Sequence, residues 1–186
     1  MYPITLSLGV RVMTDRGLFV GRFQPFHKGH LKAVKDILGK VDELVIVVGS
    51  SQYSHTLDNP FTTGERITMI RRAMEEAGIS HSKYWMVPVP DIHIHMLWVA
   101  RVKGYAPRFD IVCSNEPLTR RLFIEAGYNV EPIPFHKRDT YSSTEIRDRM
   151  LSRKRWEELV PETVAGFIKE IGGVERLRDL AKTDKI

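Results

Sequence analysis

The sequence is poor in cysteine and in long apolar runs, and each shortage excludes a class of protein. A single cysteine, Cys113, stands among the 186 residues, so neither a disulfide framework nor a cysteine-based metal site can form within the chain. This cysteine content is compatible with a reducing compartment. No stretch approaches the roughly eighteen consecutive apolar residues of a membrane-spanning helix. We therefore expect a globular, cytoplasmic protein with no membrane partner.

The first sixteen residues lack a convincing secretory signal. No positive region precedes the apolar stretch from Ile4 to Val12, and no small-residue cleavage site follows it. Met13 stands just before the first predicted core strand, so we interpret residues 1–16 as an upstream extension or the result of a misassigned start codon. We assign them no function and expect residues 17–186 to form one domain, which their number allows.

Basic residues outnumber acidic ones, which gives a formal net charge of +5. Such a surplus is typical of proteins that bind nucleic acids, anionic membranes or phosphorylated small molecules. The basic run between residues 147 and 155 is most simply an exposed helix surface. Because the sequence lacks the interleaved aromatic and basic residues of an RNA-binding surface, we expect no nucleic-acid partner.

Short apolar runs alternate with helical patterns along most of the chain. The runs predict buried strands at residues 18–20, 44–48, 84–89, 109–113 and 128–132. Apolar side chains at three- and four-residue spacing predict helices that begin near residue 29, run from residue 62 to Gly78, and cover residues 96–103 and 116–126. This alternation is typical of an α/β fold with a Rossmann-like, doubly wound parallel sheet of about five strands.

Two capping boxes indicate helix starts. Thr62 and Glu65 form the first, and the expected buried face of that helix consists of Ile67, Ile70, Met74 and Ala77. Ser142 and Glu145 form the second, and helical patterns follow again after residues 161 and 173. We expect residues from about 142 to 186 to form a helical cap on the sheet.

The stretch from Gly21 to His30 joins the first predicted strand to the first predicted helix, where open α/β sheets bind nucleotides. It places His27 and His30 at a helix N-terminus, whose free N–H groups and positive dipole end attract phosphate. Arg22 stands at the strand tip, and Gly29 allows a ligand to approach the backbone. Capping alone would explain one histidine, but the pattern H-x-G-H favours a phosphate-binding site.

A second helix start has groups of the same kind. Ser142 and Thr144 offer hydroxyls and Arg147 a guanidinium, which could bind the β- and γ-phosphates from the side opposite the histidines. Capping boxes are common, so this interpretation depends on the H-x-G-H motif.

Together these motifs resemble those of the nucleotidyltransferase superfamily that shares H-x-G-H with class I aminoacyl-tRNA synthetases. Within it, the chain is similar to the archaeal-type nicotinamide-mononucleotide (NMN) adenylyltransferases. The similarity runs from Gly17 to Lys185 through separate motifs in the same order: G-R-F-Q-P-F-H-K-G-H at 21–30, S-S-Q at 50–52, S-H at 54–55, N-P-F-T at 59–62, G-E-R at 64–66, Trp98, and S-S-T-E-I-R at 142–147.

The resemblance implies transfer of the adenylyl group of ATP to NMN, giving NAD and pyrophosphate. The NMN phosphate would attack the α-phosphorus in line, without a covalent enzyme intermediate, so that catalysis is positioning and charge stabilisation. The expected catalytic residues are Arg22, His27, His30 and Arg147. The expected ATP-binding residues are Gly21, Arg22, Phe23, His27, Gly29, His30, Ser142, Thr144 and Arg147.

The NMN side of the site is also implied by the resemblance. Trp98 would stack on the nicotinamide ring, and the Asp91-Ile92 loop would read the carboxamide. The expected NMN-binding residues are Ser50, Asp91, Ile92 and Trp98. From the residues alone, Trp98 could be an ordinary core aromatic on its helix, which is the usual role of such a residue.

Two loops depart from the family pattern. The family often has an arginine for the NMN phosphate where Leu57-Asp58-Asn59 stands here, so other groups must bind that phosphate. The loop Ser114-Asn115-Glu116-Pro117 stands where relatives tend to show S-G-N-P.

The expected cofactor is Mg²⁺, held by the phosphates of ATP and by water, with no protein metal site. His93 and His95 lie close in sequence to Asp91, but tetrahedral zinc would need further ligands. The expected partners are ATP and NMN, and we expect a homo-oligomer. Two alternatives stay open: transfer to another phosphorylated acceptor, such as flavin mononucleotide (FMN) or phosphopantetheine, and a non-catalytic nucleotide- or RNA-binding module.

Overall fold

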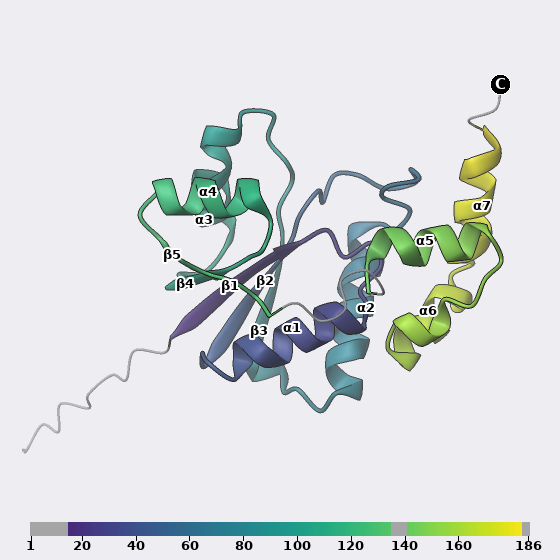
Figure 1. The fold of residues 1–186 in the computed structure, drawn as a ribbon, viewed down its shortest axis with the longest axis horizontal. Coiled ribbons are helices and arrows are strands. Elements are labelled where there is room, and N and C mark those ends of the chain that lie inside the picture. The colour runs from purple at the N-terminus through teal and green to yellow at the C-terminus, as the bar shows by residue number, and fades with distance from the viewer. Residues whose placement is uncertain (1–14, 135–140, 184–186) are drawn as a thin grey trace, which may run out of the picture.

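The computed structural model describes residues 15–134 and 141–183 and shows one sheet with helices on both faces (Figure 1). Its strands run in the order β3-β2-β1-β4-β5, and each pairs with its neighbours in parallel. The predicted doubly wound parallel sheet is confirmed. The strands are β1 (Arg16–Gly21), β2 (Glu43–Val48), β3 (Tyr84–Pro88), β4 (Ile111–Cys113) and β5 (Asn129–Glu131).

Helices α3 and α4 cover one face of the sheet, and α1 and α2 cover the other (Figure 1). Helix α6 packs on α2, and α7 packs on α5 and α6. No helix in the described ranges is both long and apolar enough to cross a membrane. The α-helices are α1 (Lys28–Leu38), α2 (Thr63–Glu76), α3 (Trp98–Tyr105), α4 (Pro117–Glu125), α5 (Ser143–Leu151), α6 (Glu162–Glu170) and α7 (Gly173–Thr183). Short 3-10 helices are η1 (His81–Lys83), η2 (His95–Leu97) and η3 (Glu157–Leu159).

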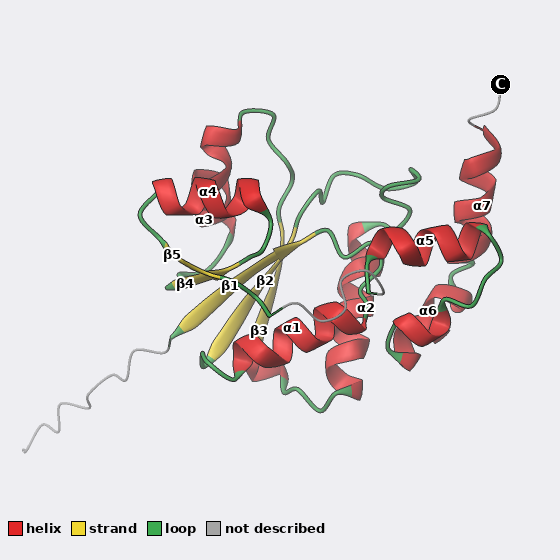
Figure 2. Cartoon of the chain, viewed as in Figure 1, coloured by secondary structure: helices red, strands yellow, loops and turns green. Residues whose placement is uncertain are grey.

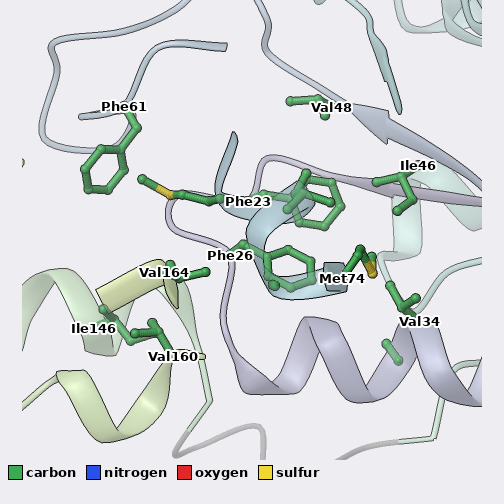
Figure 3. Close-up of a cluster of buried hydrophobic side chains, with 14 of the residues drawn as sticks. Phe23, Phe26, Val34, Ile46, Val48, Phe61, Met74, Ile146, Val160 and Val164 are labelled. Carbon is green, nitrogen blue, oxygen red and sulfur yellow. The ribbon is translucent and has the colours of Figure 1, made fainter. Parts of the chain in front are cut away.

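Successive residues of β2 point to opposite faces of the sheet, so this strand supplies two separate apolar clusters. Leu44, Ile46 and Val48 belong to the cluster on the side of α1 and α2. Val45 and Val47 belong to the cluster covered by α3 and α4. The first cluster extends into the C-terminal region through Ile146, Val160 and Val164 (Figure 3). The C-terminal helices therefore pack on the same core as the sheet.

Two local predictions need correction. Strand β1 already begins at Arg16, which was assigned to the extension; this residue pairs with Glu43 of β2, and an ion pair of 2.8 Å joins their side chains. The inner face of α2 is broader than predicted. Ile70 and Met74 are buried as expected, Ile67 and Ala77 are only partly buried, and Arg66, Met69 and Ala73 are buried as well. The rest of the expected extension, residues 1–14, lies outside the described residues.

Candidate active site

The loop between β1 and α1 ends in two histidines that cap α1 together. His27 is the N-cap residue, and its Nδ1 accepts the backbone N–H of His30 at 3.2 Å. In return, Nδ1 of His30 accepts the backbone N–H of His27 at 3.3 Å. The two rings stack with their centroids 3.5 Å apart. The imidazoles thus take the places that a hydroxyl and a carboxylate occupy in an ordinary capping box.

This reciprocal capping fixes the tautomer of both rings. A ring nitrogen that accepts a hydrogen bond carries no proton, so the proton of each neutral imidazole lies on Nε2. Within the described ranges, neither Nε2 donates to another residue. Each histidine therefore offers one free N–H donor at the start of the helix.

Both imidazoles are neutral near neutral pH. Burial lowers the pKa of His27 from 6.5 to about 3. Burial, and then the charge of His27, lower the pKa of His30, whose ring centroid lies 4.9 Å from that of Phe23 and 5.4 Å from that of Phe26. The pair therefore contributes oriented hydrogen-bond donors, and the positive charge of the site has to come from other residues.

A cavity of about 240 Å³ opens beside the histidines, at the carboxyl ends of β1 and β4. These two strands flank the point where the strand order reverses, which is where open α/β sheets bind their ligands. Long loops leave this end of the sheet (Figure 2). The residues that line the cavity include His27, Gly29, His30, Ser114, Asn115 and Tyr141.

The loop after β4, which departs from the family pattern, forms one wall of this cavity. The side chain of Asn115 donates to the carbonyl of Ile133 at 2.6 Å and accepts its N–H at 3.0 Å. It therefore extends the contact between β4 and β5 beyond the strand ends. Glu116 is the N-cap residue of α4 and accepts the N–H groups of Leu118 and Thr119.

Two glycines of the motif make room for other side chains. A Cβ on Gly29 would lie 2.9 Å from the Cβ of Tyr141, and one on Gly21 would lie 2.7 Å from the ring of Phe23. Phe23 itself is buried, with 1% of its surface exposed. A contact between Phe23 and ATP would therefore come from its backbone.

Arg147 is buried, and its guanidinium contacts the same loop. It donates to the carbonyl of Gln24 at 2.9 Å and to Oδ1 of Asp58 at 3.3 Å. Asp58, the departure from the family pattern, thus pairs with the cationic residue of the second motif. The pKa of Arg147 is lowered, mainly by burial. The negative charge of Asp58 opposes this shift, and the positive charge of Arg22 adds to it. The exposed Arg22 is therefore a second positive charge near Arg147.

The N-terminus of α5 lies against the loop after β1. Ser143 donates from its hydroxyl to the carbonyl of Pro25 at 3.1 Å. Ser142 is the N-cap residue and accepts the N–H of Glu145 at 3.1 Å. The second predicted capping box is only half formed, because the carboxylate of Glu145 pairs with Arg149, four residues on, at 2.7 Å.

The structure therefore brings residues 21–30 and 142–147 together, as a shared phosphate site requires. Thr144 is exposed on the first turn of α5. The binding of ATP by these residues stays a prediction.

A second cavity, of about 420 Å³, has Asp91, Ile92 and Trp98 in its lining, beyond the carboxyl end of β3. Ser50 is tied to it, since its N–H donates to Oδ1 of Asp91 at 3.1 Å. All four predicted NMN-binding residues thus come together. Trp98 is half-buried and also packs against the cluster under α3 and α4, so it lines the cavity and supports the core at once.

Several residues of this cavity were not predicted from the sequence. Tyr53 and Leu118, which are 41% and 44% exposed, line it together with His93 and His95. The position of Tyr53 directly after the S-S-Q motif is a signal that could have found it. In the described ranges, no three His, Cys, Asp or Glu side chains gather in a way that could hold a metal ion.

Arg66 is another residue whose role was not predicted from the sequence. It is fully buried and bonds to backbone carbonyls at the ends of β1 and β2. Its place in G-E-R, one turn after the Thr62 cap, is the available signal.

Comparison with known proteins gives the family. Residues 18–149 match the cytidylyltransferase-like family. The chain is 54% identical over 166 residues to the nicotinamide-nucleotide adenylyltransferase of Pyrococcus horikoshii, covering 89% of each chain. It is 56% identical over 171 residues to that of Ignicoccus hospitalis, covering 91% of this chain and 99% of the relative.

Solved structures share the fold. A crystal structure of a bifunctional NMN adenylyltransferase/ADP ribose pyrophosphatase from Francisella tularensis matches with a TM-score of 0.77 at 21% identity, covering 92% of this chain and 54% of that one. A structure of such a bifunctional protein from the same organism, complexed with AMP and a Mn ion, matches with a TM-score of 0.73 at 21% identity, over 90% and 52% of the two chains. This chain spans about half of each. The chain belongs to the cytidylyltransferase-like family and, within it, to the archaeal nicotinamide-nucleotide adenylyltransferases, as its motifs predicted.

Proposed function

We propose that this chain transfers the adenylyl group of ATP to NMN and so forms NAD and pyrophosphate. The observation that carries the proposal is the pairing of two cavities at the carboxyl edge of one sheet, one beside the two histidines and one beside Trp98. Two relatives that are 54% and 56% identical to this chain are named nicotinamide-nucleotide adenylyltransferase, after that activity. The first cavity takes ATP, and the second takes the nicotinamide end of NMN.

The reaction needs no nucleophile from the protein, because a phosphate oxygen of NMN attacks the α-phosphorus and pyrophosphate leaves. Cys113 is unsuited to that role, since burial raises the pKa of its thiol to about 11. His27 and His30 donate from Nε2 to phosphate oxygens whose charge grows in the transition state. Arg22 and Arg147 supply the positive charge that the neutral imidazoles do not.

A divalent metal ion, Mg²⁺, accompanies ATP. No described cluster of three His, Cys, Asp or Glu side chains is available to hold it, so its ligands come mainly from phosphates and water. When bound, Mg²⁺ neutralises charge on the phosphate chain. We further propose a homo-oligomer located in the cytoplasm.

The test is whether the protein forms NAD from ATP, NMN and Mg²⁺. A coupled assay measures the NAD that is formed. A panel with deamido-NMN, FMN and phosphopantetheine as acceptors, and with CTP in place of ATP, checks the substrate class. Faster turnover with another acceptor would replace NMN in the proposal. No turnover with any acceptor, together with RNA binding that survives physiological salt, would favour the binding module.

A further inference from the structure

Arg66, on the first turns of α2, is a buried guanidinium held entirely by neutral acceptors. Its side chain has no exposed surface. A guanidinium has five N–H donors, and here each has a partner. The acceptors are the carbonyls of Arg22 (2.8 Å), Gly49 (2.7 Å), Ser50 (3.1 Å) and Thr62 (3.4 Å) and the hydroxyl of Thr63 (2.9 Å).

Three of these acceptors lie at the ends of the neighbouring strands β1 and β2, and the other two, Thr62 and Thr63, lie at the start of α2. Arg22 directly follows β1, whereas Gly49 and Ser50 directly follow β2. One side chain therefore joins the loop that carries the histidine pair to the loop that leads to the second cavity. Since all five donors are used inside the protein, none is left for a substrate.

The bond to Ser50 reaches the second cavity through this one residue. Ser50 has a φ of 49°, a left-handed conformation that a serine seldom adopts. Its carbonyl accepts from Arg66, and its N–H donates to Asp91, which lines that cavity. These two bonds hold Ser50 in its unusual conformation and fix Asp91 relative to Arg66.

The charge of Arg66 is buried without an ion-pair partner among the described residues. In the described ranges no carboxylate contacts its guanidinium, and burial lowers its pKa to about 10. A buried charge is costly unless it is hydrogen-bonded, and here all five N–H donors are paired. These directed bonds fix the loops after β1 and β2 relative to each other.

We propose that Arg66 is a positioning residue for adenylyl transfer, an inference that rests on the proposed function. By joining the loops after β1 and β2, it sets the separation of the two bound substrates, so that the NMN phosphate lies in line with the α-phosphorus. A misplacement of about 1 Å can lower the rate of such a reaction about 10²-fold.

The test uses Arg66→Met and Arg66→Lys. Methionine removes all five bonds, and lysine keeps the charge but cannot bond to both strand ends. We expect kcat per folded molecule to fall about 100-fold in Arg66→Met and at least about tenfold in Arg66→Lys, while both KM values change only a few-fold. Arg72→Met is the matched control, because Arg72 lies on the same helix but pairs with Glu170 of α6 at 2.8 Å. It should lower the melting temperature and leave kcat at the parental value.

A second variant covers the case in which Arg66→Met and Arg66→Lys do not fold. Thr63→Val removes one acceptor of Arg66 and the 2.6 Å bond from Thr63 to the carbonyl of Ser51. We expect a few-fold loss of kcat with a nearly parental melting temperature. Parental turnover in the folded Arg66 variants, or in Thr63→Val if those do not fold, would overturn the inference. A parent that forms no NAD would instead contradict the proposed function, and the inference with it.

Discussion

His27 and His30 each accept the backbone N–H of the other through Nδ1, at 3.2 and 3.3 Å. The residues that begin α1 are therefore the same residues that line the neighbouring cavity, and each has its Nε2 proton free of the cap. A proton on either Nδ1 would remove a capping acceptor. The capping of α1 and the hydrogen-bond donors of the site therefore both depend on the protonation state of the two imidazole rings.

The first prediction concerns acid stability. The pKa of His27 is lowered to about 3 in the folded protein, from 6.5 when unfolded, so the unfolded chain binds more protons between these values. The associated stability is complete above about pH 6.5 and is lost as the pH falls toward 3, by on the order of a few kcal/mol. Melting temperatures across pH 3–7 check this. His27→Asn keeps a capping acceptor without titrating, so it should reduce the dependence and leave the part that comes from His30. An unchanged slope would contradict the assignment.

The second prediction concerns Gly29. A Cβ at this position would lie 2.9 Å from the Cβ of Tyr141 and 3.1 Å from the ring of His27. Gly29→Ala should therefore lower the free energy of unfolding by about 1–3 kcal/mol and reduce kcat, as measured by urea titration and by turnover. Gly64→Ala is the control, because a Cβ there meets nothing within 4 Å and alanine favours the helix. Equal effects of the two changes would refute the packing argument.

A third prediction concerns Trp98, which lines the second cavity and also packs on the core. Trp98→Ala should weaken NMN binding by about 1–3 kcal/mol, by analogy with the loss of a stacked base contact. Calorimetric titration with NMN measures it. The control is Trp85→Ala, which removes an exposed tryptophan of the edge strand β3 whose indole N–H donates to Glu43 of β2. If Trp98→Ala loses thermal stability but keeps its affinity for NMN, Trp98 acts only in the core.

A fourth prediction concerns the pair formed by Asp58 and Arg147. The carboxylate and a phosphate would compete for the same guanidinium, so Asp58→Asn should lower the KM for ATP a few-fold. Stability should hardly change, because the Asp58 side chain is 78% exposed and such pairs contribute about 1 kcal/mol or less. The control is Glu170→Gln, which breaks an exposed pair with Arg72. An unchanged or higher KM in Asp58→Asn would show that Asp58 does not compete with ATP.

The parallel sheet was predictable because continuous apolar runs such as residues 44–48 are typical of strands buried on both faces. The H-x-G-H motif placed His27 and His30 at a helix start, and that position is confirmed. Their reciprocal capping was not predicted, because histidine is not among the usual capping residues. Here burial keeps both rings neutral, so that each can accept a backbone hydrogen bond.

Contacts between distant segments were beyond sequence reasoning. Spacing along α2 marked its apolar residues, but an arginine on the inner face of a helix is readable only when its acceptors are known. The ends of β1 and β2 supply those acceptors for Arg66. The pairing of Asp58 with Arg147 spans 89 positions in the chain, and no local pattern reports it.

The most direct measurement is the turnover of His30→Ala with ATP, NMN and Mg²⁺. If Nε2 of His30 donates to an oxygen whose charge grows during transfer, its loss raises the barrier more than it weakens binding. We expect kcat to fall about 10²–10³-fold with much smaller changes in either KM, and stability to fall by about 1 kcal/mol through the lost cap. A folded His30→Ala enzyme that turns over within a few-fold of the parent would contradict the central role given to the histidine pair.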